Sequence, residues 1–307
     1  MKTQLIVALT MLVPSIYLTG CSTVLSEKIE SVSHGVDVGE EKLVYRVYLP
    51  PSYEAEPNRQ FPLLVWFHGG GGNEKTWGKV GGIGERLLQP MSTGEWPEFI
   101  VVSPTVGEFD VYNNGDDEAL INKVLPRVNR EYRTNGVTLA YGHSMGGLNA
   151  LMVTLRHPEK FDGLAVASPF AFDTSPYDCE LAIEGFEKKF GAGWQGVYRR
   201  GIKSYFGNKQ SFDAYDPFTQ VRRTSTLPFP VLLTSGTRDG FGLFPHNQHL
   251  HQMFVRSGIS HDWLVQKDVG HGTVVSPAIY EWLELQAGVA AKNMAQYPQP
   301  ERTAGGR

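Results

Sequence analysis

The segment Gly142-His143-Ser144-Met145-Gly146 places a serine in the pattern G-x-S-x-G, between an apolar run and a stretch with helical periodicity. This pattern is typical of a sharp strand-to-helix turn that holds the serine in a strained conformation. Glycine neighbours let the backbone pack closely at such a turn. We therefore expect the Ser144 hydroxyl to stand exposed above a sheet edge. The N–H of Met145 should lie free at the helix N-terminus, where developing negative charge is stabilised.

Apolar runs of strand length alternate with helical segments along the rest of the chain. This alternation predicts one α/β domain with a mostly parallel sheet, whose functional residues lie at the carboxyl ends of the strands. Pro126 falls inside one expected helix and predicts a kink or break there. The expected strands cover residues 42–49, 61–67, 99–102, 137–141, 163–167, 230–234 and 263–266, and the expected helices cover residues 116–132, 146–157, 246–257 and 276–285.

Two motifs downstream of Ser144 supply the partners that a serine nucleophile needs. Asp239 ends the polar turn after residues 230–234, and His271 lies between two glycines after residues 263–266. A serine hydroxyl is weakly nucleophilic at neutral pH, so it requires a histidine as base and a carboxylate to orient that histidine. The chain order of the three residues is the one expected of an α/β-hydrolase. Taken singly, His271 also fits a surface loop histidine, and Asp239 a turn or helix-cap aspartate.

Four consecutive glycines, residues 69–72, follow the most apolar strand candidate. They match the HGGG-type motif whose backbone N–H groups stabilise an oxyanion, so we expect Gly70 and Gly71 to donate alongside Met145. A flexible turn is the alternative. His68 is expected to support this loop from a buried position, and His143 to pack beside the nucleophile without a catalytic need.

Composition narrows the range of ligands. The 307 residues carry a net charge of −4 and no basic run, which disfavours a nucleic-acid partner. His246, His249 and His251 lack a nearby carboxylate in the sequence and are interpreted as polar helix residues, so no metal site is expected. The glycine run lacks the Lys-Ser/Thr of a phosphate-binding loop, so no cofactor is expected either.

The first 20 residues predict a secretion signal, because Lys2 precedes an apolar run over residues 5–13 that is too short to span a membrane. They end in Leu18-Thr19-Gly20-Cys21, which resembles the bacterial lipobox. This resemblance implies diacylation of Cys21 and a lipid anchor in the membrane of the cell envelope. Ser22, rather than Asp, follows the cysteine, and this resemblance to the sorting pattern of Gram-negative lipoproteins implies the outer membrane. A standard signal peptide with an incidental cysteine is the alternative.

The remaining organisation is predicted from composition. Residues 21–35 are polar and small and are interpreted as a lipidated tether, and residues 36–285 as the catalytic domain. Residues 170–226 interrupt the pattern and predict a small insertion over the active site, or a peripheral decoration. Residues 286–307 are expected to form a flexible tail. The insertion contains aromatic residues suited to stacking on a phenolic or sugar group, or to forming its own core, namely Phe170, Phe172, Tyr177, Trp194, Tyr198 and Tyr205.

Together these motifs resemble the esterase D group of α/β-hydrolases, which includes S-formylglutathione hydrolases, feruloyl and acetyl-xylan esterases and siderophore esterases. The resemblance covers most of residues 42–285. It implies the α/β-hydrolase fold, with a mostly parallel central sheet flanked by helices, and places the family's nucleophile, acid and base on Ser144, Asp239 and His271. It rests on residues 141–147, 156–161, 167–169, 212–217, 236–239 and 270–272.

One departure from this group bears on the substrate. Its thioesterase members carry a cysteine shortly after the oxyanion glycine, whereas no cysteine lies near residues 69–72 here. We therefore expect a serine carboxylic-ester hydrolase that forms an acyl-enzyme with a small or polysaccharide-linked ester of short acyl, acetyl or feruloyl type. Two alternatives stay open: a serine peptidase of the prolyl-oligopeptidase type, and a non-catalytic surface binding protein on the same scaffold. The sequence indicates no oligomeric state.

Overall fold

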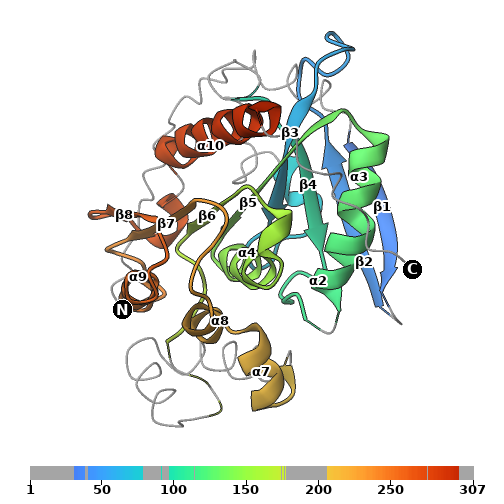
Figure 1. The fold of residues 1–307 in the computed structure, drawn as a ribbon. Coiled ribbons are helices and arrows are strands. Elements are labelled where there is room, and N and C mark those ends of the chain that lie inside the picture. The colour runs from blue at the N-terminus through green and yellow to red at the C-terminus, as the bar shows by residue number, and fades with distance from the viewer. Residues whose placement is uncertain are drawn as a thin grey trace, which may run out of the picture.

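A twisted eight-stranded sheet forms the centre of the protein (Figure 1). The computed structural model describes residues 31–38, 41–78, 91, 97–113, 115–173, 175, 177, 206–274 and 276–296. The strand order is β1-β2-β4-β3-β5-β6-β7-β8, and all strands from β3 onward are parallel, while β1 and β2 form an antiparallel hairpin. The strands are β1 Ser31–Val38, β2 Glu41–Tyr48, β3 Phe61–Phe67, β4 Ile100–Thr105, β5 Thr134–His143, β6 Gly163–Ala167, β7 Val231–Gly236 and β8 Asp262–Gln266.

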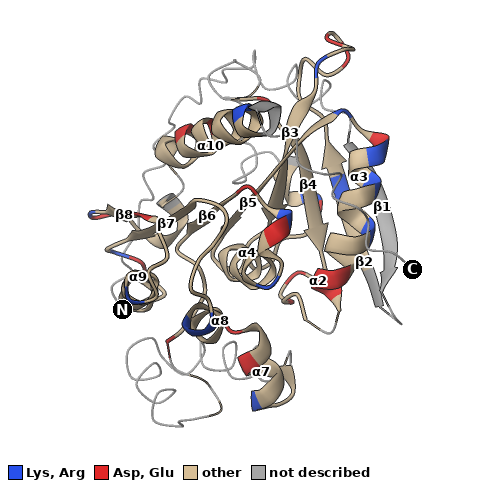
Figure 2. Ribbon diagram, viewed as in Figure 1, with Lys and Arg blue, Asp and Glu red and all other residues tan. Residues whose placement is uncertain are grey.

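Strands β3 to β7 contain no Asp, Glu, Lys or Arg, so they are tan in Figure 2. Near-continuous apolar strands suit a parallel sheet that is covered on both faces. Successive side chains point to opposite faces, and the two faces belong to separate cores. In β3, for example, Val65 and Phe67 lie in the first core, and Leu64 and Trp66 lie in the second.

Helices cover both faces of the sheet (Figure 1). The first core packs under α4, α8 and α9 and includes Leu151, Phe218 and Phe254, whereas the second lies under α10 and includes Ile279 and Leu283. The helices and short helical turns are η1 Thr76–Gly78, α2 Asp116–Ala119, η2 Leu120–Val124, α3 Leu125–Glu131, α4 Met145–Arg156, η3 Pro158–Lys160, α7 Lys209–Tyr215, α8 Pro217–Arg223, α9 Phe244–Arg256, η4 His271–Thr273 and α10 Pro277–Gln296.

The expected disturbance at Pro126 takes the form of a π-helical turn rather than a break. Segments α2, η2 and α3 follow one another without interruption, and the Leu125 N–H bonds the carbonyl of Leu120, five residues back. Proline has no N–H to donate within a helix and its ring crowds the preceding turn. A single wide turn next to the proline accommodates both constraints.

Two predicted boundaries are wrong. The tether was expected to extend to residue 35, but Ser31–Val38 is strand β1, which pairs from Ser31↔Tyr48 to Val38↔Glu41. The flexible tail was expected to begin at residue 286, but α10 continues to Gln296. Small alanines allow this extension, because Ala287 is buried in the second core and Ala290 and Ala291 pack against it.

The described part of the predicted insertion at residues 170–226 contains two helices that the sequence pattern did not indicate. Asn208 caps α7 and Asp216 caps α8, each accepting a hydrogen bond from a backbone N–H three residues later. Asp216 therefore has a structural role as a helix cap. Residues 174, 176 and 178–205 of the insertion, with Trp194, Tyr198 and Tyr205, lie outside the described residues, as do the predicted signal peptide and Cys21. In the part of the chain that the structure describes, no helix is long and apolar enough to cross a membrane.

Candidate active site

Ser144 occupies the turn between β5 and α4 with φ 59° and ψ −123°. A non-glycine residue in this conformation is strained, and close packing of the glycines around it imposes the turn. A side chain on Gly142 would lie 2.1 Å from the carbonyl oxygen of Gly146, and one on Gly146 would lie 2.0 Å from that of Phe67. The two glycines of the motif are therefore required for the elbow to form.

The backbone of Ser144 is held on both sides. Its N–H donates to Ala167 at the end of β6 (3.0 Å), and its carbonyl accepts from the N–H groups of Leu148 (3.1 Å) and Phe170 (2.8 Å). The elbow is thus fixed to its own helix and to the segment that follows the neighbouring strand. The side chain of Ser144 points away from this anchored backbone to a histidine from another loop.

The structure brings Ser144, His271 and Asp239 into one hydrogen-bonded chain. His271 Nε2 lies 2.8 Å from Ser144 Oγ, and His271 Nδ1 lies 2.8 Å from Asp239 Oδ2. Asp239 follows β7 and His271 follows β8, so both residues stand at the same carboxyl edge of the sheet as Ser144. Because a carboxylate only accepts, Nδ1 carries the proton and Nε2 is free to accept one from the serine.

The Asp239 carboxylate is fully buried. Burial opposes its ionisation, but hydrogen bonds from His271 and from the N–H of Phe241 (2.9 Å) outweigh this cost, so the pKa of Asp239 lies below its usual range. The charged carboxylate therefore persists at neutral pH and stabilises positive charge on His271.

Two rings enclose the His271 imidazole. Phe241 lies edge-on at 4.5 Å between centroids, and His143 lies on another side at 4.6 Å. His143 also bonds the carbonyl of His271 through Nε2, at 2.8 Å. Sequence reasoning gave His143 only a packing role and missed Phe241. The ring nitrogens of a buried imidazole need hydrogen-bond partners, and this requirement could have indicated a partner for His143.

Of the two glycine N–H groups that were expected to be free, those of Gly70 and Gly71, only the first is free within the described part of the chain. The N–H of Gly71 donates to the carbonyl of Glu108 (2.7 Å), so it is not available to an oxyanion. Among the described residues, the N–H groups of Gly70 and Met145 have no such partner. The prediction for Gly71 is therefore wrong, because a second loop engages its N–H. Gly71 instead supplies the left-handed backbone of the turn, with φ 77°.

His68 supports this loop from below, as expected. Its side chain is buried, and its ring nitrogens lie 3.0 Å from the Gly69 carbonyl and 2.8 Å from Thr105 Oγ1. Burial lowers the pKa of His68, so the ring is neutral at neutral pH. A neutral, fully bonded imidazole positions the glycine loop and does not act as a base.

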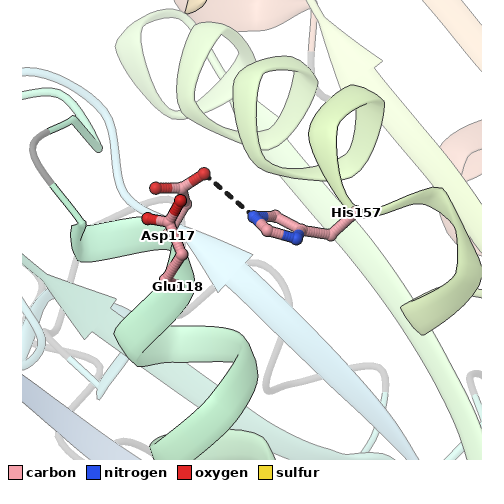
Figure 3. Close-up of side chains that lie close together, drawn as sticks. All are labelled: Asp117, Glu118 and His157. Atoms are coloured by element: carbon pink, nitrogen blue, oxygen red, sulfur yellow. Dashed lines mark hydrogen bonds and ion pairs between the residues drawn. The ribbon is translucent and has the colours of Figure 1, made fainter. Parts of the chain in front are cut away.

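One cluster in the described residues has the composition of a metal site, formed by Asp117, Glu118 and His157 (Figure 3). It lies where α2 meets the C-terminus of α4, away from Ser144 at the other end of that helix. The guanidinium of Arg156 already bonds Asp117 (2.6 Å) and Glu118 (3.0 Å), and His157 Nε2 donates to Asp117 (2.9 Å). Because a resident cation already pairs with both carboxylates, we interpret the cluster as an ion-pair network that ties the two helices together.

The three histidines of α9 do not act as one group. His246 and His249 both bond the carboxylate of Asp173, at 2.8 and 2.9 Å, a partner that the sequence could not indicate because it lies 73 residues away from His246. His251 instead pairs with His261, at 2.7 Å. The histidines are therefore hydrogen-bonded residues of the helix face, and two of them attach the segment after β6 to α9.

Comparison with known proteins places this geometry in a family. The model of the family described as "Putative esterase" matches residues 38–284. An endo-1,4-beta-xylanase/feruloyl esterase from Xylanibacter ruminicola is 30% identical over 134 residues, which are 38% of this chain and 18% of that enzyme. An S-formylglutathione hydrolase from Arabidopsis thaliana is 23% identical over 224 residues, covering 65% of this chain and 70% of the relative.

Solved structures agree on the fold. A ferulic acid esterase, 22% identical in sequence, superposes with a TM-score of 0.59 over 85% of this chain and 99% of its own. Likeness at this level of identity shows the α/β-hydrolase fold, whose active-site residues stand at the carboxyl ends of the strands, as they do here. The chain therefore belongs to this esterase family and carries, on an α/β-hydrolase fold, the serine-centred site of a carboxylic ester hydrolase.

Proposed function

We propose that this protein hydrolyses carboxylic esters of aromatic acids through an acyl-enzyme on Ser144. The observation that carries the proposal is the continuous chain from Asp239 through His271 to Ser144, with both hydrogen bonds at 2.8 Å. The three residue types in this arrangement are those needed to activate a hydroxyl that is otherwise a weak nucleophile.

In the acylation step, Ser144 Oγ attacks the ester carbonyl carbon while its proton moves to Nε2 of His271. Nδ1 of His271 keeps its own proton and donates it in a hydrogen bond to Asp239, whose charge stabilises the imidazolium. The N–H groups of Gly70 and Met145 hold the oxyanion, which is favoured further by the N-terminus of α4. Cleavage of the bond to the alcohol then sends the proton of His271 to the leaving oxygen.

In the deacylation step, water takes the place of the alcohol. His271 removes its proton, the resulting oxygen attacks the acyl carbon, and the same N–H groups hold the second oxyanion. Collapse returns the proton to Ser144 and releases the acid. His271 therefore serves both steps: it takes a proton from the nucleophile, which is first Ser144 and then water, and gives it to the leaving oxygen, which is first that of the alcohol and then that of Ser144.

Aromatic side chains from three loops next to the reacting residues support an aromatic substrate. Phe109 is 57% exposed, and its ring lies 3.5 to 3.6 Å from where side chains on Gly70 and Gly71 would begin. Phe170, whose N–H bonds Ser144, and Phe241, beside His271, are both partly exposed. An exposed ring over the oxyanion loop gains from stacking on a planar acid. The two feruloyl-type relatives act, by their names, on such acids.

The missing cysteine after the glycine loop supports an ester rather than a glutathione thioester. Gly72 is followed here by Asn73 and Glu74, and the two cysteines of the chain, Cys21 and Cys179, are distant in sequence. The proposal therefore separates this protein from the thioesterase members of the group that it resembles.

A fluorophosphonate probe and a substrate panel test the proposal together. We expect the probe to label the wild type and not Ser144→Ala, and methyl ferulate to be hydrolysed faster than S-formylglutathione. Equal labelling of both proteins, or of neither, would remove the serine mechanism. Labelling with turnover of acetyl esters alone would remove only the aromatic specificity.

We further propose that the protein is a lipoprotein of the bacterial envelope, held by a diacylated Cys21 and directed to the outer membrane. Residues 18–21, placed after an apolar segment, support this location. Mass spectrometry of the mature N-terminus should find the diacylated cysteine, and Cys21→Ala should leave the membrane fraction. A free Cys21, or cleavage elsewhere, would contradict the anchor.

A further inference from the structure

The proposed base receives no side-chain packing from its two neighbours in the loop, because both are glycines. His271 lies between Gly270 and Gly272, and a side chain added to Gly272 would meet nothing within 4 Å. Movement of this loop would slow catalysis, because a base displaced by about 1 Å loses on the order of 100-fold in rate. The position of His271 therefore depends on the contacts that hold its backbone.

At least three carbonyl groups of this loop accept hydrogen bonds. The carbonyl of Val269 accepts from the N–H of Arg238, just after β7 (2.9 Å), and that of Val274 accepts from the side chain of Gln266, at the end of β8 (2.6 Å). The third carbonyl, that of His271 itself, bonds Nε2 of His143 (2.8 Å). The backbone of the base is thus attached directly to the residue that precedes the nucleophile in the chain.

We propose that His143 is a positioning residue that sets the distance between the base and the nucleophile, an inference that rests on the proposed serine mechanism. Its N–H fixes the carbonyl of His271, and its ring packs against the imidazole at 4.6 Å. The ring of Phe241 also contacts the imidazole, at 4.5 Å between centroids, so both the position and the rotation of the His271 side chain are restricted. The elbow then holds the nucleophile directly and the base through His143.

The protonation state of His143 suits this role. A carbonyl oxygen only accepts, so Nε2 must carry a hydrogen. Burial, and after it the neighbouring His271, lower the pKa of His143 to about 4, although the bond to the His271 carbonyl and the charge of Asp239 act in the opposite direction. The ring therefore stays neutral at neutral pH and adds no positive charge beside His271 when that residue accepts the serine proton.

Two variants separate positioning from packing. His143→Leu keeps the apolar volume but removes the donor, whereas His143→Gln keeps an amide N–H at nearly the place of Nε2. Each is assayed for kcat and KM per active site, titrated with a fluorophosphonate, so that unfolded protein does not count. We expect kcat of His143→Leu to fall roughly 10- to 100-fold with KM within about 2-fold, and His143→Gln to stay within about 5-fold of the wild type.

The outcomes are distinct. A wild-type kcat per site in His143→Leu, or an equal loss in both variants at an unchanged melting temperature, would overturn the inference. If His143→Leu does not fold, His143→Phe keeps a ring and removes the donor, and the same fall is expected. Ser144→Ala is the reference: activity that survives in it removes the serine mechanism, whereas an inactive Ser144→Ala with unaltered His143 variants removes only the role of His143.

Discussion

An aspartate–histidine pair lies near each end of helix α4. At its N-terminus, Asp239 Oδ2 lies 2.8 Å from His271, and at its C-terminus Asp117 Oδ2 lies 2.9 Å from His157. Both carboxylates are almost fully buried. The two pairs nevertheless differ in what surrounds them, and the difference shows which contacts make such a pair fit for catalysis.

At the N-terminal pair, the second ring nitrogen of His271 faces the hydroxyl of Ser144 at 2.8 Å. The Asp239 carboxylate accepts its remaining hydrogen bonds from uncharged backbone and side-chain donors. At the C-terminal pair, Arg156 bonds the same carboxylate oxygen as His157, and among the described residues no hydroxyl forms a hydrogen bond with the His157 side chain. The aspartate there is already neutralised by a permanent cation. An Asp–His pair thus activates a nucleophile only where the histidine is the sole cation available and has a hydroxyl in reach.

Asp239→Asn gives the largest expected effect, because it removes the carboxylate of the catalytic pair. An amide at this position favours the wrong imidazole tautomer, so kcat should fall by about 10⁴-fold. The melting temperature should change by only a few degrees, as for any single lost hydrogen bond. Steady-state assays on methyl ferulate measure the effect, with Asp117→Asn as the matched control. A kcat within 10-fold of the wild type would mean that Asp239 does not orient the base.

Asp117→Asn should reverse this pattern. Removing one partner of a buried ion pair leaves the other charge without compensation, and here we expect about 3 kcal/mol of stability to be lost, since the Arg156 side chain is 23% exposed and partly solvated. Activity per titrated site should stay within about 2-fold. Urea unfolding measures the loss, and an activity decrease like that of Asp239→Asn would show that the two pairs are coupled through α4.

The pH dependence of stability should reveal the contribution of the cluster formed by Asp117, Glu118 and His157. Burial opposes ionisation of Asp117, but His157, Glu118 and Arg156 hold the pKa of Asp117 well below its usual range. A lowered pKa contributes stability that is present above the unfolded value, about 4, and is lost as the pH falls through the folded value. The urea midpoint should therefore fall in acid, and fall less in Asp117→Asn; parallel profiles would contradict this.

Glu118 should act in the opposite sense. The neighbouring Asp117 and burial raise the pKa of Glu118, so its proton is held more tightly in the folded state. That contribution is complete below the unfolded pKa and is lost as the pH rises through the folded one. Glu118→Gln keeps a neutral donor at this place. Its urea midpoint should change less than that of the wild type between about pH 4 and 6.

Phe109→Ala gives the smallest expected effect and sharpens the substrate proposal. Loss of one exposed stacking ring is worth about 1 kcal/mol, so KM for methyl ferulate should rise about 5-fold. The KM for a short acetyl ester should not change, because that substrate has no ring. The exposed Val265 on β8 supplies the control, with Val265→Ala. An equal change for both esters would mean that Phe109 shapes the oxyanion loop and not the acyl site.

Local sequence pattern predicted the central strands because apolar runs without charge have few other uses in a chain of this size. It also indicated Ser144, Asp239 and His271, since each follows a recognisable strand and parallel strands end at one edge. Strand β1 was missed because its small and polar residues resemble a linker, and its pairing with β2 is what makes it a strand. The C-terminal part of α10 was missed because alanine carries little periodic signal.

Contacts between distant loops could not be predicted. Whether the N–H of Gly71 is free depends on the carbonyl of Glu108, and the role proposed for His143 depends on a carbonyl 128 residues later. Asp173 reaches His246 across 73 residues in the same way. Each of these bonds joins groups that every sequence contains in abundance. Only the folded arrangement selects which of them meet.

The central claim is that Ser144 carries the acyl group during turnover, and the acyl-enzyme itself tests it most directly. Wild-type protein mixed with excess methyl ferulate is quenched in acid, digested and mapped by mass spectrometry. We predict one feruloyl group on the peptide that contains Ser144, and none in Ser144→Ala. Turnover of the ester with no acyl group on that peptide, or persisting in Ser144→Ala, would contradict the mechanism.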